Sequence, residues 1–424
     1  MDIMMLMKTT TAARSTLKKT FGFSSFRPHQ KDIIEAILEG QDVFAVLPTG
    51  GGKSLCYQLP SLLLEGLSIV ISPLLALMKD QVDAAVDTGI PAACLNSSLT
   101  PAEASAVYRR LEAGEIKLLY ISPERFALPH FAEQLKAYGV KRFAVDEAHC
   151  LSEWGHDFRP DYLNLGTIRS SFPDTAIAAF TATATLKVQK DIVKLLRLQD
   201  PFTVRASFDR AELRYRIIPK EDATGQILRF ISERPGESGI IYRTSRANTE
   251  KTAAFLVHHG VRALPYHAGL ARQNRMENQD LFNRDEADVI VATIAFGMGI
   301  DKSNVRFIIH ADMPKSIEGY YQETGRAGRD GLPAECLFLY SSGDISRVRY
   351  FIDQIKKKGE RARAEKNLQS IVTLASTNMC RRKQILEYFD EEPPDTCGNC
   401  DVCLGEIKTA DASEDARKLL SAVA

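Results

Sequence analysis

A glycine-rich segment, Leu47-Pro-Thr-Gly-Gly-Gly-Lys-Ser54, has the residue types that can hold the phosphates of a nucleotide. Glycines let backbone N–H groups turn toward phosphate oxygens, and the N-terminus of a following helix adds its positive end. In such a loop the lysine reaches the terminal phosphates and the hydroxyl ligates Mg²⁺. The nucleotide-binding residues expected here are Thr49, Gly50, Gly51, Gly52, Lys53 and Ser54, and those expected at Mg²⁺ are Ser54 and Asp146. Because Leu47 replaces the first glycine of the strict pattern, a glycine-rich surface turn is the alternative.

A pair of carboxylates ends the segment Phe143-Ala-Val-Asp-Glu-Ala-His149. An enzyme that hydrolyses a magnesium nucleotide needs one carboxylate for the metal and another to orient or deprotonate the attacking water. Asp146 suits the first role and Glu147 the second, and His149 is a further candidate catalytic residue. Taken alone, such a pair is more often an ordinary loop start; an upstream phosphate loop favours the catalytic interpretation.

The segment Tyr321-Gln-Glu-Thr-Gly-Arg-Ala-Gly-Arg329 carries two arginines. The spacing of Gln322, Arg326 and Arg329 predicts that they share one face of a helix. Arginines presented in this way can meet the charge that develops on a γ-phosphate, an effect of about 10³–10⁵ in rate in enzymes that use an arginine finger. A glycine-interrupted helix with solvated arginines is the alternative.

Four cysteines cluster near the end of the chain: Cys380, Cys397, Cys400 and Cys403. Four thiolates at this spacing are enough for a closed tetrahedral zinc site, which has no open position and is therefore structural. Disulfides are the alternative, and a reducing cytoplasm disfavours them. The other four cysteines lie in apolar surroundings and are expected to be buried small hydrophobic residues: Cys56, Cys94, Cys150 and Cys336.

Two series of short apolar runs, separated by helix-like segments, must position these residues. Such alternation predicts βαβ units and two consecutive α/β domains with mostly parallel sheets. The predicted strands are 42–47, 67–72, 91–95, 116–122, 141–146 and 176–182, then 238–243, 261–266, 288–293, 305–310 and 334–340. A charged helical region follows from Asp344 to about Asp390. The predicted domains are 1–208, 209–342 and a zinc-binding subdomain at 343–406, with a tail at 407–424.

Composition adds little about partners. The chain has 54 Lys and Arg against 54 Asp and Glu, so its net charge does not indicate a nucleic-acid partner. Between Arg347 and Lys366 there are eight basic residues and three acidic ones, for which a solvated helix face is the simplest interpretation. No apolar run approaches the ~20 residues that span a bilayer, and the opening segment is too short for a signal peptide. We therefore expect a cytoplasmic protein without a membrane partner.

Taken in order, these segments resemble superfamily 2 helicases and, more narrowly, the RecQ family of DNA helicases. The resemblance runs from about Phe21 to Cys403 and accounts for Leu47, because the phosphate loop of this superfamily matches from Pro48 onward. Phe21-Gly-Phe-Ser-Ser-Phe-Arg-Pro-His-Gln30 is similar to the adenine-recognition motif, which implies that Phe23, Arg27 and Gln30 contact adenine. Further segments that resemble the family's motifs are 72–81, 122–125, 181–185, 239–245, 266–269 and 292–301.

The segment Leu151-Ser-Glu-Trp-Gly-His-Asp-Phe-Arg-Pro160 resembles the aromatic-rich loop with which RecQ proteins sense single-stranded DNA. Bases stack on aromatic side chains for about 1–3 kcal/mol each, whatever their identity. Trp154 and Phe158 would supply rings, and His156 and Arg159 cationic or hydrogen-bonding groups. As an alternative, Trp154 and Phe158 anchor the loop in the core.

The resemblance implies an α/β fold of two tandem RecA-like parallel-sheet domains, followed by a small helical zinc-binding subdomain. It implies an ATP- and Mg²⁺-dependent helicase with one Zn²⁺ site, moving 3′ to 5′ on single-stranded DNA in repair and recombination. The implied substrates are single-stranded DNA and tailed or forked duplexes; a monomer is expected, with a single-strand-binding protein as a further partner. Many members continue into a winged-helix domain, which we expect this chain to lack, as an excised core or a naturally short member. The alternatives are an RNA helicase, a translocase that does not separate strands, and a zinc-dependent DNA-binding or annealing module.

Overall fold

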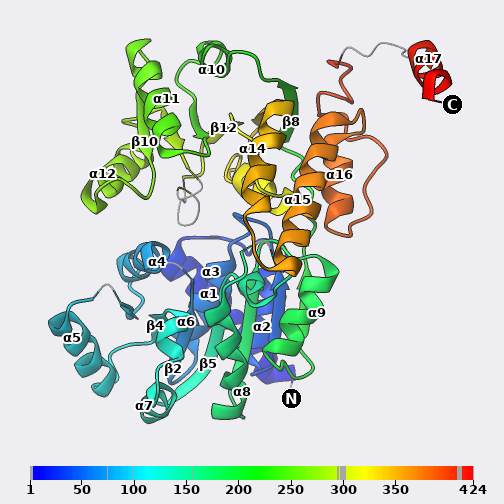
Figure 1. Cartoon of the computed structure of the whole chain (residues 1–424). Helices are drawn as coiled ribbons and strands as arrows, with labels where there is room; N and C mark the ends of the chain where they lie inside the picture. The colour runs from blue at the N-terminus through cyan, green and yellow to red at the C-terminus, as the bar shows by residue number, and fades with distance from the viewer. Residues whose placement is uncertain are drawn as a thin grey trace.

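The computed structural model contains two parallel β-sheets, one in each of two domains, and a helical region beside the second sheet (Figure 1). The residues that it describes are 3–73, 75–97, 99–155, 157–293, 296, 302–407 and 413–423. Within this part of the chain, no helix has the length and apolar character needed to cross a membrane. The predicted fold class, two tandem RecA-like domains and a small helical subdomain, is confirmed.

The first sheet has seven parallel strands in the order β3-β4-β2-β5-β6-β1-β7. Its strands are β1 (Val43–Val46), β2 (Leu67–Ile71), β3 (Ala92–Leu95), β4 (Leu118–Ile121), β5 (Val140–Val145), β6 (Ala176–Thr181) and β7 (Phe202–Arg205). Alternate residues of a strand enter different clusters, as Val70 and its neighbour Ile71 do, because successive side chains point to opposite faces. Both faces are therefore buried beneath helices.

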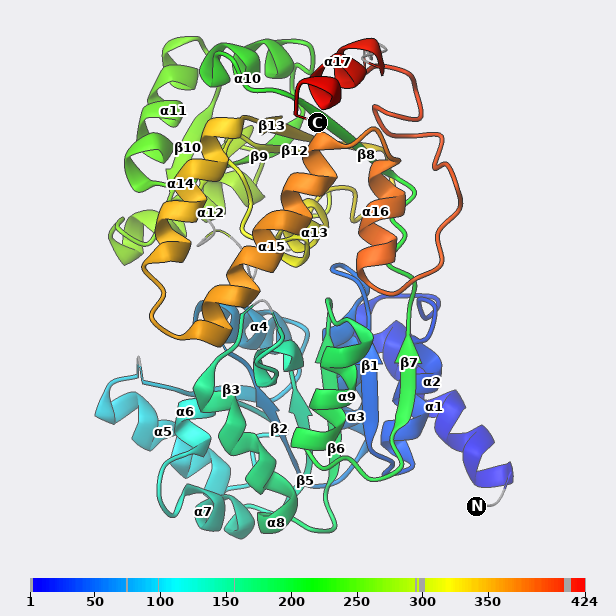
Figure 2. The same cartoon turned by 45° about the vertical axis from the view of Figure 1, so that its right-hand side comes forward.

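Four helices pack on one face of this sheet: α1 (Ile3–Phe21), α2 (Gln30–Leu38), α3 (Lys53–Leu63) and α4 (Leu75–Asp87). The other face is covered by α5 (Pro101–Glu112), α6 (Pro123–Phe126), α7 (Phe131–Ala137), η1 (Ala148–Leu151), η2 (Pro160–Thr167), α8 (Ile168–Ser171) and α9 (Leu186–Leu195). Figure 2 shows the second set in front of the sheet. This arrangement leaves the carboxyl edge of the strands as the place where loops can carry a site.

The second sheet has six parallel strands in the order β10-β11-β9-β12-β13-β8. They are β8 (Leu213–Pro219), β9 (Ser238–Tyr242), β10 (Ala263–Tyr266), β11 (Val289–Ala292), β12 (Val305–His310) and β13 (Ala334–Tyr340). One face packs against α10 (Ala223–Ser232) and α11 (Arg246–His258). The opposite face packs against α12 (Arg272–Asn283), α13 (Ile317–Thr324) and the zinc-binding subdomain.

Three helices build that subdomain: α14 (Ser342–Asp353), α15 (Lys358–Ser376) and α16 (Arg381–Tyr388). Its cysteine loop follows the edge strand β8, since Cys400 forms a parallel bridge with Tyr215 and the backbone N–H of Asp401 donates to the Tyr215 carbonyl over 3.1 Å. The loop thereby covers a sheet edge that would otherwise expose unpaired backbone groups. A separate helix, α17 (Ser413–Val423), ends the described chain.

The interdomain linker, residues 206–212, is held by the zinc-binding subdomain. The ring of Phe208 stacks on Phe389, with centroids 4.3 Å apart and 4° between the planes. The Arg382 guanidinium donates to the carbonyls of Arg210, Ala211 and Leu213 over 3.1, 3.2 and 2.8 Å. The linker is therefore fixed by specific contacts with the zinc-binding subdomain.

Candidate functional site

The phosphate loop joins β1 to α3 in a conformation that glycine is needed to adopt. Gly50 and Gly52 have φ angles of 78° and 76°, and Gly52 is the N-cap of α3. A Cβ atom on Gly52 would lie 2.2 Å from Nε2 of Gln30, so a side chain there would displace the Gln30 amide. The loop therefore delivers the backbone to the positive end of a helix, as a phosphate-binding loop requires.

Two of the residues predicted to contact adenine, Arg27 and Gln30, bind the backbone carbonyls of this loop. The amide Nε2 of buried Gln30 donates to the carbonyls of Gly52 and Gly51 over 3.1 and 3.4 Å. The Arg27 guanidinium donates to the Gly50 carbonyl, and its backbone N–H donates to Oε1 of Gln30 over 2.9 Å. Phe23, the third member of the set, is 55% exposed. Arg27 and Gln30 thus position the backbone that would touch phosphates.

The carboxylate pair follows β5 at the carboxyl edge of the first sheet. Glu147 adopts the left-handed conformation, with φ 48°, and its backbone N–H donates to Oδ1 of Asp146 over 3.0 Å. Burial and then the charge of Glu147 raise the pKa of Asp146 to about 7, and the Lys53 ammonium opposes this rise. Burial raises the pKa of the Tyr57 hydroxyl. The charge of the Asp146 carboxylate adds to this rise, and a hydrogen bond with the Ser54 side chain opposes it. Ser54 follows Lys53 in the first turn of α3, and the charges of Lys53 and Asp146 interact. Oxygen donors such as the Ser54 hydroxyl and the Asp146 carboxylate fit Mg²⁺.

A polar path leads from this pair to the second domain. Nδ1 of buried His149 lies 3.3 Å from Oε2 of Glu147 and 2.9 Å from the hydroxyl of Thr181. The Thr181 hydroxyl donates to the carbonyl of Thr183 over 3.2 Å. Nε2 of Gln322, on α13, donates to the hydroxyl of Thr183 over 3.1 Å. The predicted residues Glu147, His149 and Gln322 are thus brought together, and the threonines between them come from the segment 181–185.

The arginine segment reaches the phosphate loop, although the prediction of a shared helix face is wrong. α13 ends at Thr324, and residues 325–330 form turns. A Cβ on Gly50 would lie 3.2 Å from Cγ of Arg329, and one on Gly325 would lie 3.3 Å from Cβ of Thr49. The turns therefore place the segment across the domain interface. The glycines in the segment, which weaken a helix, are the physical reason for the difference.

Arg326 is 5% exposed and lies beside Tyr242, the last residue of β9. Burial raises the pKa of the Tyr242 hydroxyl, and a hydrogen bond and charge from Arg326 oppose this rise. The same hydroxyl donates to the Phe296 carbonyl over 3.1 Å. The second domain thus holds Arg326 from inside while Arg329 faces the phosphate loop.

Arg210 belongs to this site and was not predicted. Its guanidinium donates to the Thr49 carbonyl in the phosphate loop over 3.3 Å. It also donates to Gly325, Ala327 and Gly328 in the arginine segment, over 3.2, 2.9 and 3.4 Å. No motif marks Arg210 in the sequence; its position in a short polar linker between two domains was the available signal.

The aromatic-rich loop follows η1 on the first domain. Trp154 is 52% exposed, with the Lys187 ammonium over its ring and the Arg363 guanidinium carbon 6.0 Å from its centroid. Phe158 is half-buried, whereas Arg159 donates to the Pro73 carbonyl over 2.8 Å and pairs with Asp157. Arg159 therefore braces the loop against the segment 72–81. The predicted residue His156 lies outside the described residues, as do residues 294–295 and 297–301 of the segment 292–301.

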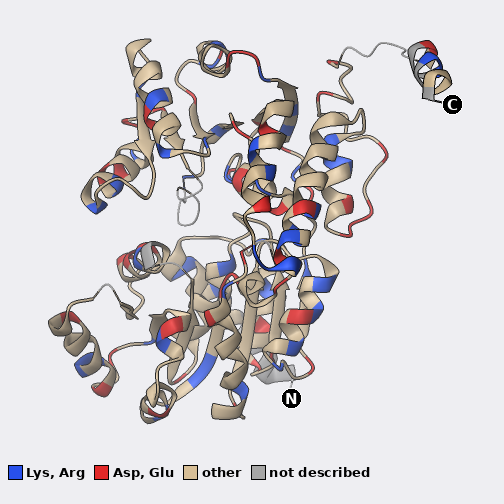
Figure 3. Ribbon diagram, viewed as in Figure 1, with Lys and Arg blue, Asp and Glu red and all other residues tan. Residues whose placement is uncertain are grey.

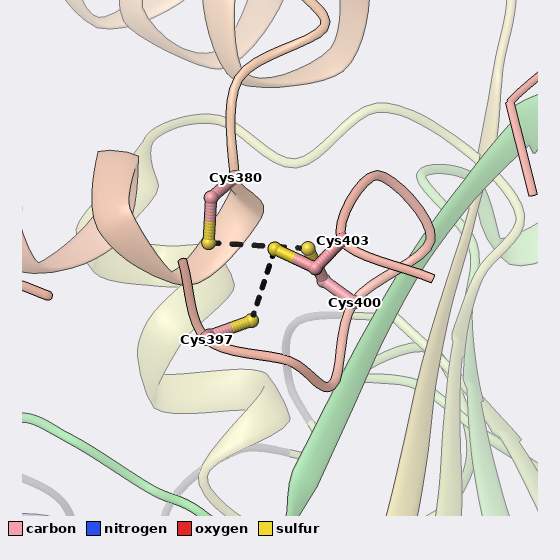
Figure 4. A group of neighbouring side chains, drawn as sticks. All are labelled: Cys380, Cys397, Cys400 and Cys403. Carbon is pink, nitrogen blue, oxygen red and sulfur yellow. Dashed lines mark hydrogen bonds between the residues drawn. The ribbon is translucent and has the colours of Figure 1, made fainter. Parts of the chain in front are cut away.

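The four clustered cysteines meet as predicted (Figure 4). Their sulfur atoms all lie within 4.8 Å of one another, with 3.9 Å between Cys397 and Cys403 and between Cys380 and Cys400. Tetrahedral zinc with Zn–S bonds of about 2.3 Å separates its sulfur ligands by roughly 3.8 Å. The spacing fits zinc, and the Cys₄ site for Zn²⁺ is confirmed. Cys380 is also the N-cap of α16, so a bound metal would fix the start of the helix that carries Arg382.

Three family models match the chain in sequence. The DEAD/DEAH box helicase model matches residues 27–192, the helicase conserved C-terminal domain model residues 220–331, and the RecQ zinc-binding model residues 342–404. Together they match six strands of the first sheet, four strands of the second sheet and the cysteine cluster.

Curated relatives match nearly the whole chain. The "ATP-dependent DNA helicase RecQ" of Pasteurella multocida is 46% identical over 97% of this chain and 65% of its own length. The protein of the same name from Bacillus subtilis is 43% identical over 97% of this chain and 70% of its own length. The "RecQ-like DNA helicase BLM" of Xenopus laevis is 44% identical over 94% of this chain and 31% of its length. The chain thus spans about two thirds of the bacterial relatives, at 65% and 70% of their lengths.

Solved structures of helicases share the fold at low identity. The Mycobacterium smegmatis helicase Lhr, bound to ssDNA and AMP-PNP, has a TM-score of 0.61 at 18% identity, over 87% of this chain and 58% of that one. The DEAD-box helicase Mss116, bound to ssRNA and UDP-BeF, has a TM-score of 0.66 at 17% identity, over 97% of this chain and 93% of that one. With the phosphate loop, the carboxylate pair and the Cys₄ site in place, and with 43% identity over 70% of the Bacillus subtilis protein, the chain belongs to the RecQ family.

Proposed function

We propose that this chain is the motor core of an ATP-dependent DNA helicase that moves 3′ to 5′ along single-stranded DNA. The observation that carries the proposal is the position of Arg329, a residue of the second domain, against Gly50 of the phosphate loop in the first. A nucleotide bound at that loop would contact both domains, so its hydrolysis would change how they are held together. The names of the RecQ relatives, all DNA helicases, support DNA as the substrate.

The first domain would hold the nucleotide. Backbone N–H groups of residues 49–54 would surround the phosphates, and Lys53 would neutralise their charge. Ser54 and Asp146 would hold Mg²⁺, which supplies charge to the β- and γ-phosphate oxygens when it is bound. Phe23, which is exposed, would pack on the adenine ring, with Arg27 and Gln30 at its edge.

Glu147 would orient the attacking water and accept its proton, and His149 would hold the Glu147 carboxylate in place. Arg326 and Arg329 would meet the charge that develops on the γ-phosphate, as arginine fingers do. Gln322 would report the state of the carboxylate pair to α13 through Thr183, to which it is hydrogen-bonded.

Single-stranded DNA would contact the aromatic-rich loop through Trp154, His156, Phe158 and Arg159. The ring of Trp154 is exposed and near the cations Lys187 and Arg363, which suits binding of a base of any identity and its phosphate. We propose tailed and forked duplexes as substrates, a role in repair and recombination, and action in the cytoplasm as a monomer. A single-strand-binding protein is a further proposed partner.

The test is strand separation on duplexes with a 3′ or a 5′ single-stranded tail, with ATP consumption followed in the same samples. The matched control is the Lys53→Ala variant, which should bind single strands and hydrolyse no ATP. We expect the protein to unwind the 3′-tailed duplex and not the 5′-tailed duplex. DNA-stimulated hydrolysis without unwinding would reduce the proposal to a translocase, and stimulation by RNA but not by DNA would overturn it.

A further inference from the structure

An exposed aromatic pair lies at the end of α14, in the basic region between Arg347 and Lys366. Tyr350 is 65% exposed and Phe351 is 62% exposed, with ring centroids 5.7 Å apart and an edge-to-face angle of 74°. The buried and half-buried residues Ile345, Val348 and Ile352 form the inner face of the helix. The two rings therefore lie outside the packed part of the subdomain. Isolated exposed hydrophobic residues are common, but adjacent large rings bordered by charge are typical of a binding site.

The residues around this pair carry an excess of positive charge. Arg349 is its neighbour on α14, and Lys356, Lys357 and Lys358 lie in the turn that follows α14 and at the first residue of α15. Of the ion pairs in the described part of the chain, none includes any of these four residues, whereas Arg361 pairs with Asp353 and Glu365 over 2.5 and 3.2 Å. In Figure 3 this turn is a continuous basic stretch above the first domain. Two of the three acidic groups between Arg347 and Lys366, Asp353 and Glu365, are thus matched by Arg361, and the four cations face solvent with only Glu360 to offset them.

The helices α14 and α15 form a hairpin, and the tip of this hairpin lies next to the aromatic-rich loop. Arg363, one turn into α15, has its guanidinium carbon 6.0 Å from the centroid of the Trp154 ring. The Arg361–Asp353 ion pair holds the same turn of α15 against the end of α14 that carries the aromatic pair. Figures 1 and 2 both show the α14–α15 turn on the side of the subdomain that faces the first domain. The aromatic pair is therefore an extension of the surface to which Trp154 belongs.

We propose that the hairpin tip (Arg349, Tyr350, Phe351 and Lys356–Lys358) is a second contact for single-stranded nucleic acid. Tyr350 and Phe351 stack on bases, and the four cations meet the phosphates of the same strand. The combination of π-faces with unmatched positive charge selects a polyanion that carries bases, because an acidic peptide would use the cations and leave the rings without partners. A strand that leaves Trp154 passes Arg363 to reach the tip. This inference rests on the proposed function, since it extends the path of the same strand.

The test is the equilibrium binding of labelled oligo-dT, measured by fluorescence anisotropy at several salt concentrations. One variant combines Tyr350→Ala with Phe351→Ala, and a second combines Lys356→Gln, Lys357→Gln and Lys358→Gln. The charge-matched control changes three exposed cations of α1, which lies on the first domain: Arg14→Gln, Lys18→Gln and Lys19→Gln. Trp154 is the sole tryptophan, so its fluorescence reports the aromatic-rich loop separately from the tip.

We expect the aromatic variant to bind oligo-dT about 5- to 30-fold more weakly, in line with the loss of one stacked base or more. The lysine variant should lower the slope of log K against log salt by about 2, since each phosphate contact contributes roughly 0.7 for single strands. At saturating DNA, both should keep the full Trp154 fluorescence change and the unstimulated ATPase.

Wild-type affinity and slope in both hairpin variants would overturn the inference. If the hairpin lysine variant lost no more affinity for oligo-dT than the α1 control, the inference would also be overturned, because the loss would then be a general effect of charge. Failure of the proposed function is distinguishable, because the wild-type chain itself would then fail to bind oligo-dT or its ATPase would not respond to DNA.

Discussion

The guanidinium of Arg210 donates to the carbonyl of Thr49, which joins the interdomain linker to the phosphate loop of the first domain. The same side chain donates to three carbonyls of the arginine segment in the second domain. One buried cation thus fixes both walls of the proposed nucleotide site. It has no contact with the carboxylate pair among the hydrogen bonds of the described residues, so its role is positioning.

We expect Arg210→Lys to lower kcat of the ATPase by about 10- to 100-fold, because a single ammonium cannot reproduce a planar fork that serves four carbonyls. Steady-state kinetics and the thermal midpoint should be measured together. Arg216→Ala is the control, since Arg216 lies on β8 just past the linker and its side chain pairs with Glu335 and Glu406. Equal kcat values for wild type and Arg210→Lys would contradict the positioning role.

Gly52→Ala should abolish nucleotide binding, since its Cβ would meet the Gln30 amide that holds the loop. Gly40→Ala is a matched control because Gly40 has a similar φ of +79° and no atom within 4 Å of the added Cβ. Both substitutions carry the backbone cost of a left-handed alanine, about 1–2 kcal/mol. Titration with a fluorescent ATP analogue separates them: the Gly40 variant should bind normally. If both lost affinity equally, backbone strain rather than the collision would be the cause.

The hydrogen bond between Gln322 and Thr183 should couple the two domains during hydrolysis. In a double-mutant cycle with Gln322→Ala and Thr183→Val, we expect an interaction of about 0.5–1.5 kcal/mol in the free energy derived from DNA-stimulated kcat/KM. The unstimulated rate should show a smaller interaction. Strictly additive effects in the stimulated reaction would mean that this contact does not transmit the DNA signal.

Zinc removal should weaken the linker as well as the subdomain. Cys397→Ser is expected to lose the metal, lower the thermal midpoint by more than about 5 °C and reduce the ATPase, because α16 would no longer present Arg382 to the linker. The comparison is Cys94→Ser, which changes a half-buried cysteine of the first domain. Metal content by elemental analysis and the melting curve decide the matter. One zinc per chain in the Cys397 variant would contradict the Cys₄ assignment.

Most of the fold could be predicted, because parallel strands that are buried on both faces have continuous apolar sequences. All eleven predicted runs correspond to strands, within two residues at either end. The two strands that were missed flank the linker. β7 has only Val204 buried, so its four residues carry no pattern. β8 alternates Leu213, Tyr215 and Ile217 with outward-facing residues, and this period of two was readable as an edge strand.

The site was predictable where residue type and local spacing carry the chemistry, as in the phosphate loop and the cysteine cluster. The site was less predictable where packing between residues distant in the sequence decides the local conformation. The turns after Thr324 depend on the phosphate loop against which they pack, and helical spacing alone misplaced Arg326 and Arg329. Arg210 acts through backbone carbonyls, which every residue has, so its partners left no trace in the sequence.

The brace formed by Arg382 has a thermodynamic consequence. Zinc would hold the start of α16, Arg382 of α16 is bonded to the linker, and Arg210 of the linker is bonded to Thr49. The metal and the nucleotide would therefore favour the same arrangement of the two domains. Linkage between two ligands is reciprocal: whatever factor zinc adds to ATP affinity, ATP must add to zinc affinity. The protein would therefore release its metal most readily between turnovers, when the nucleotide has left. The rate at which a chelator removes zinc would then report the fraction of the catalytic cycle during which the nucleotide site is empty.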